Sequence, residues 1–186
     1  MVILIGGVGY AGKTLMAQKL LEKYKFPTLS LDHIKMGLYR ADIGCGFTPT
    51  DSNELITDKL WPVVKGIIMT CIENKQNLII EGVYLCPQKV NELDEEYKAK
   101  VLSLYIGFSL SYIEKYFDSK VLGYRSVIEK RGELCDEWDV IERFIQDNIE
   151  QKEICDKYSA RYFEINDNYE EEMKNIYDWI DNEISL

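Results

Sequence analysis

The 186-residue sequence predicts an α/β fold, with a five-stranded parallel sheet, helices on both faces and a small lid. Two observations carry this prediction. Five short apolar, strand-like runs alternate with longer segments that have the spacing of amphipathic helices, and a glycine-rich loop separates the first run from the first helix. Parallel strands need a crossover segment between them, so this alternation is typical of a parallel sheet. The length suits a single domain, residues 1–186.

The glycine-rich loop fits the phosphate-binding pattern G-x-x-x-x-G-K-[ST]. It follows the apolar run 1–5 and precedes a helix with apolar residues at Met16, Leu20 and Tyr24. In this pattern backbone N–H groups surround phosphate oxygens, Lys13 reaches the outer phosphates and the Thr14 hydroxyl binds Mg²⁺. We therefore expect ATP and Mg²⁺ as cofactors. The expected nucleotide-binding residues are Gly7, Val8, Gly9, Tyr10, Ala11, Gly12, Lys13 and Thr14.

The remaining elements follow from hydrophobic periodicity and from turn residues. Further strands are expected at residues 28–31, 77–82, 101–106 and 162–165. Further helices are expected at residues 34–40, 51–74, 87–97, 109–118, 136–158 and 170–184. Asp51 and Glu54 match a capping box that would start the helix 51–74. Pro62 predicts a kink or a break in that helix near Trp61.

Charge and cysteine content restrict the class of protein. The formal net charge is −10, and 17 of the 32 acidic side chains follow residue 132, so the chain offers no basic stripe for nucleic acid. No apolar run is long enough to span a membrane, and the N-terminal run lacks the basic leader of a signal peptide. The five cysteines form no C-x-x-C pair, which favours a reducing, cytoplasmic location.

The other motifs discriminate among nucleotide-binding proteins. A GTPase of the Ras type needs an N-K-x-D motif, but residues 74–77 read Asn-Lys-Gln-Asn and lack the aspartate. Motor ATPases usually carry further domains, for which this length leaves little room. A small kinase fits better.

Three features resemble the small-molecule P-loop kinases. These are the phosphate-binding loop close to residue 1, the second strand ending at Asp32 with a basic helix behind it, and the third strand ending in Glu81 and Gly82. The family includes adenylate, shikimate, gluconate and 2-phosphoglycerate kinases and the zeta-toxin sugar-nucleotide kinases. The basic segment from Lys120 to Arg131 is similar to the family's lid, expected at about residues 119–133.

The resemblance implies roles for particular residues. Asp32 would orient the acceptor hydroxyl as a catalytic and substrate-binding residue, although an aspartate there could equally cap a helix. Arg40 would bind an anionic group of the acceptor, and Glu81 would contact the substrate and hold the Mg²⁺ shell together with Thr14. The catalytic residues expected are Lys13, Asp32, Arg125 and Arg131.

The sequence therefore predicts ATP-dependent phosphoryl transfer to a small, anionic metabolite, with an acceptor-binding arm at about residues 42–75. Two alternatives remain open: a nucleotide-binding regulatory module with only residual ATP hydrolysis, and a toxin-type kinase acting on a sugar nucleotide. Asp32 separates the first alternative from a kinase, because a regulatory switch has no need of a carboxylate directed at an acceptor.

Overall fold

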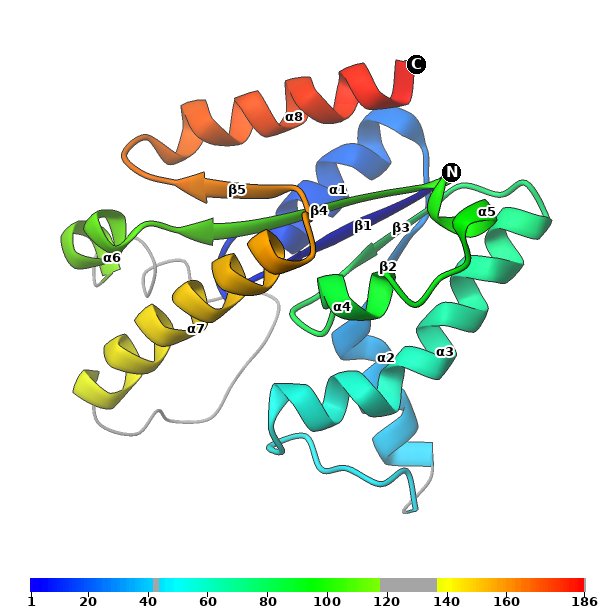
Figure 1. Ribbon diagram of the computed structural model, residues 1–186, viewed down its shortest axis with the longest axis horizontal. Helices are drawn as coiled ribbons and strands as arrows, with labels where there is room; N and C mark the ends of the chain where they lie inside the picture. Colours follow the sequence, from blue (N-terminus) through cyan, green and yellow to red (C-terminus); the bar gives the residue numbers. More distant parts are fainter. Residues whose placement is uncertain (42–43, 118–136, 186) are drawn as a thin grey trace. The chain divides into compact units, whose positions relative to one another are not determined.

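The computed structural model describes residues 1–41, 44–117 and 137–185. Within these ranges the chain forms five strands and eight helices (Figure 1). The strands are β1 (Val2–Gly7), β2 (Thr28–Ser30), β3 (Leu78–Glu81), β4 (Val101–Phe108) and β5 (Tyr162–Ile165). The helices are α1 (Lys13–Tyr24), α2 (Leu31–Ala41), α3 (Asn53–Glu73), α4 (Pro87–Val90), α5 (Glu95–Lys98), α6 (Leu110–Tyr116), α7 (Glu137–Lys157) and α8 (Tyr169–Ser185).

The five strands form one sheet in the order β2-β3-β1-β4-β5 (Figure 1). Its neighbouring strands are parallel in the pairs β2–β3, β1–β3 and β4–β5. All six residues of β1 are buried. Since successive side chains of a strand point to opposite faces, both faces of β1 are covered. The predicted α/β fold with a five-stranded parallel sheet is confirmed, while the predicted lid at 119–133 lies outside the described residues.

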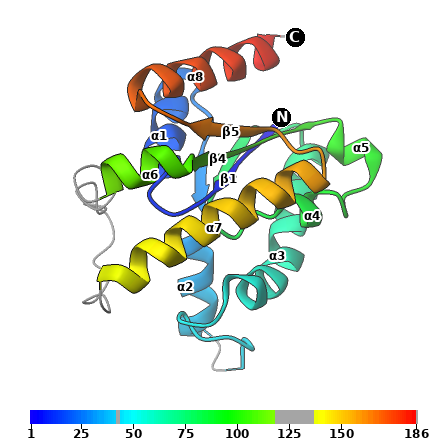
Figure 2. The same ribbon diagram turned by 60° about the vertical axis from the view of Figure 1, so that its left-hand side comes forward.

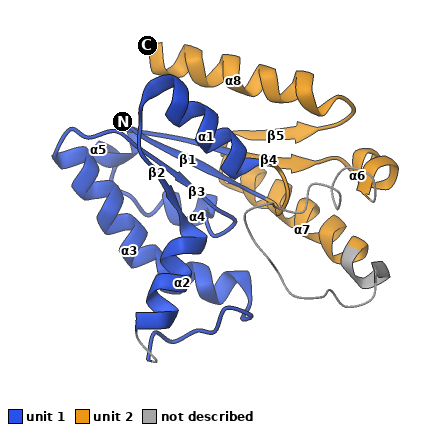
Figure 3. Ribbon diagram, turned by 180° about the vertical axis from the view of Figure 1, so that it is seen from behind, with its two compact units in different colours: residues 1–7, 12–104 blue, residues 8–11, 105–186 orange. Residues whose placement is uncertain are grey.

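The chain divides into two compact units, each assembled from two stretches of sequence (Figure 3). Unit 1 comprises Met1–Gly7 and Gly12–Leu104, and unit 2 comprises Val8–Ala11 and Tyr105–Leu186. The phosphate-binding loop therefore contributes residues to both units.

In unit 1, helix α1 packs on β1, β2 and β3, and α3 packs on β1. The α1 side chains at the predicted apolar positions Met16 and Leu20 are 0% and 1% exposed. Helix α3 continues through Pro62 without a break, and its axis bends along its length (Figure 1). An internal proline costs about 3 kcal/mol, whereas each fully buried aliphatic side chain contributes about 1.5–3 kcal/mol. The buried side chains that outweigh the proline are Ile56, Leu60, Val64, Ile68 and Ile72.

In unit 2, helices α7 and α8 both pack on β5, from opposite sides (Figures 1 and 2). Aromatic rings fill the space between the end of β4 and α7: Phe108 and Phe144 have ring centroids 5.9 Å apart, and Phe117 lies 5.4 Å from Phe144. The buried amide of Asn148 fixes α7 to β4, because its Oδ1 accepts a hydrogen bond from the Phe108 N–H at 2.7 Å.

The structure corrects several local predictions. Strand β2 ends at Ser30, and α2 begins at Leu31 rather than at residue 34. The capping box at Asp51 does not form; the Ser52 hydroxyl caps α3 by accepting from the Leu55 N–H at 3.2 Å, while the Asp51 carboxylate accepts from the Thr48 N–H. Residues 87–97 form two one-turn helices instead of one exposed helix, and Pro87, Val90 and Leu93 are buried. Strand β4 runs two residues beyond its predicted end.

None of the helices in the described part of the chain combines the length and the apolar character needed to cross a membrane.

Candidate functional site

The phosphate-binding loop connects β1 to α1 in the predicted strand–loop–helix order. Gly7, Tyr10 and Gly12 have φ values of 117°, 59° and 82°. Such values are free of steric cost only for glycine, and they cost a residue such as Tyr10 roughly 1–2 kcal/mol. Gly12 is the N-cap of α1, and no side chain caps that helix. The first N–H groups of a helix lack intrahelical acceptors and attract anions, so this loop suits a phosphate.

Unit 2 holds the middle of the loop through two hydrogen bonds. The Val8 N–H donates to the Ile106 carbonyl of β4 at 3.1 Å. The Tyr169 hydroxyl, in the first turn of α8, donates to the Ala11 carbonyl at 3.4 Å. Val8 and Ala11 are both buried. Sequence reasoning missed Tyr169, because no local pattern relates it to a loop 158 positions earlier.

Thr14 and Glu81 are brought together, as their predicted joint role requires. The Thr14 hydroxyl donates to Glu81 Oε2 at 3.2 Å. Glu81 is the last residue of β3 and is 4% exposed, and Lys13 at the start of α1 is 6% exposed. A carboxylate and a hydroxyl are oxygen ligands of the kind that Mg²⁺ accepts, with water and phosphate oxygens completing its shell. The residues present therefore fit a Mg²⁺ ion that is bound together with a nucleotide.

Glu81 lies in the sheet register between Ile5 of β1 and Ser30 of β2. The next residue, Gly82, has a φ of 155° and touches Leu31, the first residue of α2. A Cβ on residue 82 would lie 2.8 Å from the Leu31 Cβ. The missing side chain of Gly82 thus allows the end of β3 and the start of α2 to meet.

Asp32 lies in the first turn of α2, one residue after this contact. Its Oδ1 accepts from Lys35 Nζ at 3.1 Å, and the same ammonium donates to the Tyr84 hydroxyl at 2.8 Å. Lys35 is 8% exposed. Sequence reasoning did not assign Lys35 or Tyr84 a role, although the spacing of Asp32 and Lys35, three residues apart on a helix, was a usable signal.

The other predicted site residues do not belong to this cluster of Asp32, Lys35 and Tyr84. Arg40 is exposed in the last turn of α2, and the eight residues that separate it from Asp32 span about 12 Å of helix. Arg125 and Arg131, the predicted catalytic residues of the lid, lie outside the described residues.

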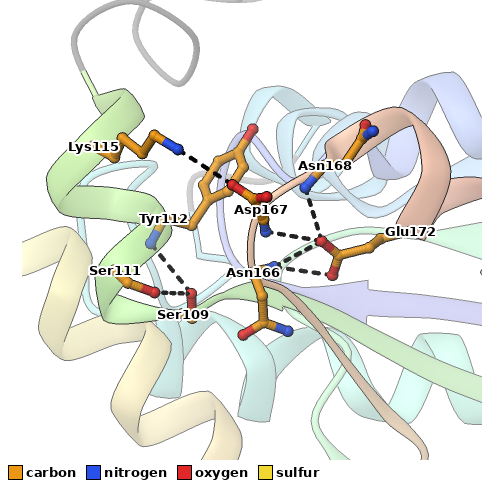
Figure 4. Close-up of polar contacts among 8 residues, drawn as sticks. All are labelled: Ser109, Ser111, Tyr112, Lys115, Asn166, Asp167, Asn168 and Glu172. Carbon is orange, nitrogen blue, oxygen red and sulfur yellow. Dashed lines mark hydrogen bonds and ion pairs between the residues drawn. The ribbon is translucent and has the colours of Figure 1, made fainter.

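A second polar group lies where β4 and β5 end (Figure 4). The carboxylate of Glu172 accepts from three consecutive backbone N–H groups at distances from 2.9 to 3.1 Å: those of Asn166, Asp167 and Asn168. Lys115 of α6 donates to the Asp167 carboxylate at 3.3 Å. These contacts fix the segment between β5 and α8, immediately before Tyr169. Sequence reasoning missed this group too, although a glutamate in the first turns of a helix is a known N-terminal signal.

A phosphate-binding loop between the first strand and the first helix of a parallel sheet, with an acidic residue at the end of the neighbouring strand, is the arrangement of P-loop nucleotide-binding folds. Comparison with known families gives the narrower assignment. The sequence model of the family described as zeta toxin matches residues 1–109, more than half of the chain, and the chain belongs to this family.

Solved structures agree with the class. Shikimate kinase from Bacteroides thetaiotaomicron is 15% identical, with a TM-score of 0.60 over 97% of this chain and 98% of that one. Shikimate kinase from Aquifex aeolicus is also 15% identical, with a TM-score of 0.54 over 99% and 98%. A gluconokinase from Sinorhizobium meliloti is 14% identical, with a TM-score of 0.50 over 93% and 87%. These likenesses establish the fold. No curated protein matches the sequence.

Proposed function

We propose that the chain is an ATP- and Mg²⁺-dependent kinase that transfers a phosphoryl group to a small, anionic, hydroxyl- or phosphate-bearing metabolite. The observation that carries the proposal is the 3.2 Å contact between Thr14, next to the phosphate-loop lysine, and the buried Glu81. Few structural roles require an ionisable carboxylate buried at a strand end beside such a loop. A metal ion bound to nucleotide phosphates would explain this carboxylate, because Mg²⁺ is usually held by one or two protein oxygens together with phosphates.

The residues divide the work of phosphoryl transfer, which depends mainly on positioning and on charge stabilisation. The loop amides and the Lys13 ammonium would bind the phosphate oxygens. Thr14 and Glu81 would hold Mg²⁺, which neutralises charge on the phosphates when bound. Asp32 would orient the attacking oxygen of the acceptor, and Arg40 would bind an anionic group on it. Arg125 and Arg131 remain the proposed catalytic cations of the lid.

Membership in the zeta toxin family favours a second, narrower candidate. The acceptor would then be a sugar nucleotide, whose phosphates would supply the negative charge that Arg40 requires. The net charge of −10 supports small molecules as partners, in place of nucleic acid or an anionic membrane surface, and we propose a cytoplasmic location.

Transfer of ³²P from [γ-³²P]ATP tests the proposal directly. The acceptors are UDP-linked sugars, shikimate, gluconate and nucleoside monophosphates, each with Mg²⁺ and with EDTA as the metal-free control. We expect Mg²⁺-dependent transfer to one acceptor class. Lys13→Met should raise the dissociation constant for ATP about 10- to 150-fold, the equivalent of one charge-assisted contact. Lys19→Met, on an exposed part of the same helix, is the matched control.

Asp32→Asn distinguishes a kinase from a regulatory nucleotide-binding module. A kinase should lose transfer by a factor of 100 or more, about the cost of a misplaced reactant, while ATP affinity stays unchanged. An Asp32→Asn variant with wild-type transfer would show that Asp32 has only a structural role in the first turn of α2. A wild-type chain that binds ATP yet labels no acceptor would favour the regulatory module.

A further inference from the structure

Lys35 is a buried ammonium whose role the proposed function leaves open. Lysine is among the residues that are least often buried, because removing its charge from water is unfavourable unless the charge is paired. Here the side chain of Lys35 is 10% exposed, and its Nζ contacts Asp32 Oδ1 at 3.1 Å and the Tyr84 hydroxyl at 2.8 Å. Both partners belong to unit 1, as Lys35 does.

The charge of Lys35 is maintained by these partners. Burial alone lowers the pKa of Lys35, but the hydrogen bonds to Tyr84 and Asp32, together with the Asp32 charge, more than offset the burial, so that the pKa lies above its ordinary value. Lys35 is therefore an ammonium at neutral pH. An ammonium has three N–H donors and no acceptor, so it can hold a carboxylate oxygen and a hydroxyl oxygen at the same time.

The position of Tyr84, which holds the Lys35 ammonium, is itself fixed by packing and by a hydrogen bond. It follows β3 and is 6% exposed, and its carbonyl accepts a hydrogen bond from the buried hydroxyl of Thr57 in α3 at 3.4 Å. Thr57, Tyr84 and Lys35 thus connect α3, the segment after β3, and α2. Through them, the orientation of Asp32 depends on packed residues and not only on its own helix.

The Asp32 carboxylate is held on one side only. Its side chain is 18% exposed, and among the described residues its hydrogen bond from Lys35 is made by Oδ1. An orienting carboxylate needs one oxygen anchored and the other directed at the reacting group, since small errors in position are costly in phosphoryl transfer. Asp32 would meet this need if Oδ1 is held by the Lys35 ammonium and Oδ2 is directed at the acceptor.

We propose that Lys35 and Tyr84 are positioning residues for Asp32. The Lys35 ammonium, oriented by the Tyr84 hydroxyl, anchors Oδ1, and Oδ2 receives the acceptor. This inference rests on the proposed kinase function. It differs from two other uses of the same lysine: an ion pair that only stabilises α2, and a cation that binds the acceptor directly.

A double-mutant cycle on the full chain separates these three roles. Transfer from [γ-³²P]ATP is measured with the UDP-linked sugars, shikimate, gluconate and nucleoside monophosphates named above, and with water as the acceptor when none is added. Lys35→Met should lower kcat about 100-fold and leave the KM for ATP within about twofold. Tyr84→Phe, which removes one hydroxyl, should lower kcat about threefold to tenfold. In an Asp32→Asn background, Lys35→Met should cause less than about a threefold further loss, because residues that act as a unit are not additive.

Lys89→Met is the control for removing a paired lysine. Lys89 also belongs to unit 1, and its ion-pair partners are Asp58 at 2.9 Å and Glu92 at 3.1 Å. We expect its kcat to match that of the wild type. Thermal unfolding and ATP affinity of every variant verify the fold, and Tyr84→Phe provides the test if Lys35→Met does not fold.

Each result has a defined meaning. Wild-type kcat in both Lys35→Met and Tyr84→Phe, with transfer intact, would overturn the inference and leave the proposed function standing. If the losses in kcat multiply in the double mutant and the KM for the acceptor rises, the inference is overturned. Lys35 would then bind the acceptor directly. A wild-type chain that transfers phosphate only to water, or to no acceptor at all, would overturn the proposed function and the inference with it.

Discussion

Gly82→Ala is expected to destabilise the protein strongly through a single added methyl group. Gly82 is buried, its φ is 155°, and its N–H donates to the Ile5 carbonyl at 3.1 Å. The new Cβ would lie 2.8 Å from the Leu31 Cβ and 3.2 Å from its Cγ. Leu31 is 1% exposed and cannot move aside without displacing the start of α2.

The magnitude follows from two separate costs. A non-glycine residue held at this φ costs about 1–3 kcal/mol, and overpacking a filled core costs about 1–3 kcal/mol. The sum, about 2–6 kcal/mol, is a large part of the roughly 5–15 kcal/mol by which a typical domain is stable. Relief of the clash would shift Leu31 and hence Asp32, so the surviving folded protein should also lose phosphoryl transfer.

Urea denaturation followed by tryptophan fluorescence measures the change in unfolding free energy. Gly37→Ala is the matched control: Gly37 lies inside α2, is exposed, and has no atom within 4 Å of an added Cβ. Alanine there should stabilise the protein by about 0.5–1 kcal/mol, because alanine is the better helix former. The two identical chemical changes should therefore have effects of opposite sign.

A Gly82→Ala protein within about 0.5 kcal/mol of the wild type would refute this reasoning, since that is the ordinary scatter of surface substitutions. It would mean that the contact between β3 and α2 is loose enough to absorb a methyl group. Gly82 would then not limit how closely the end of β3 and the start of α2 approach each other.

Three further predictions concern other residues. Glu81→Gln keeps an acceptor for the Thr14 hydroxyl but removes the negative charge. The Mg²⁺ concentration for half-maximal ATP turnover should therefore rise about tenfold, the equivalent of one charge-assisted contact. An unchanged Mg²⁺ titration would exclude Glu81 from the metal shell. Glu172→Gln should lower the unfolding free energy by about 1–2 kcal/mol in urea titrations, because the carboxylate accepts from three backbone N–H groups; no change would indicate that water replaces it. Burial raises the pKa of Tyr177 from 10.0 to about 12, so the folded protein keeps a proton that the unfolded chain loses, and stability should fall between pH 10 and 12. Calorimetric Tm values across this range should fall less steeply in Tyr177→Phe, and equal slopes would contradict the assignment.

Local sequence patterns predicted the central part of the fold well. The phosphate-binding loop combines a fixed residue pattern with a strand before it and a helix after it, so the motif and its context support each other. Strand β5 and helix α7 were also predicted to within about one residue, because their patterns are long or bounded by turn residues. The start of α2 was misplaced because the buried Leu31, which the apolar pattern assigned to the strand, is the first residue of the helix that directly follows β2.

The candidate site could be predicted only where its residues carry a local signal. Glu81 was identifiable because a carboxylate ends an apolar strand. Tyr84 and Tyr169 were not, because their roles come from contacts with Lys35 and Ala11, and such contacts depend on tertiary packing. Asp32 lies between these cases: its position near the end of β2 was predictable, but the ammonium that holds its carboxylate was visible only in the folded chain.

The discontinuous make-up of unit 2 has a consequence for biosynthesis. Residues 8–11 of the phosphate-binding loop leave the ribosome early, but their partners Ile106 and Tyr169 are made much later, the latter 158 positions downstream. At about 5–20 residues per second, the wait is about 8–30 s. During that interval the apolar strand β1 has no complete sheet around it and the nascent chain has no finished loop with which to bind nucleotide. A bound nucleotide would therefore contribute to folding only after most of the chain has been synthesised, and pairing of β1 with β3 within unit 1 can come first.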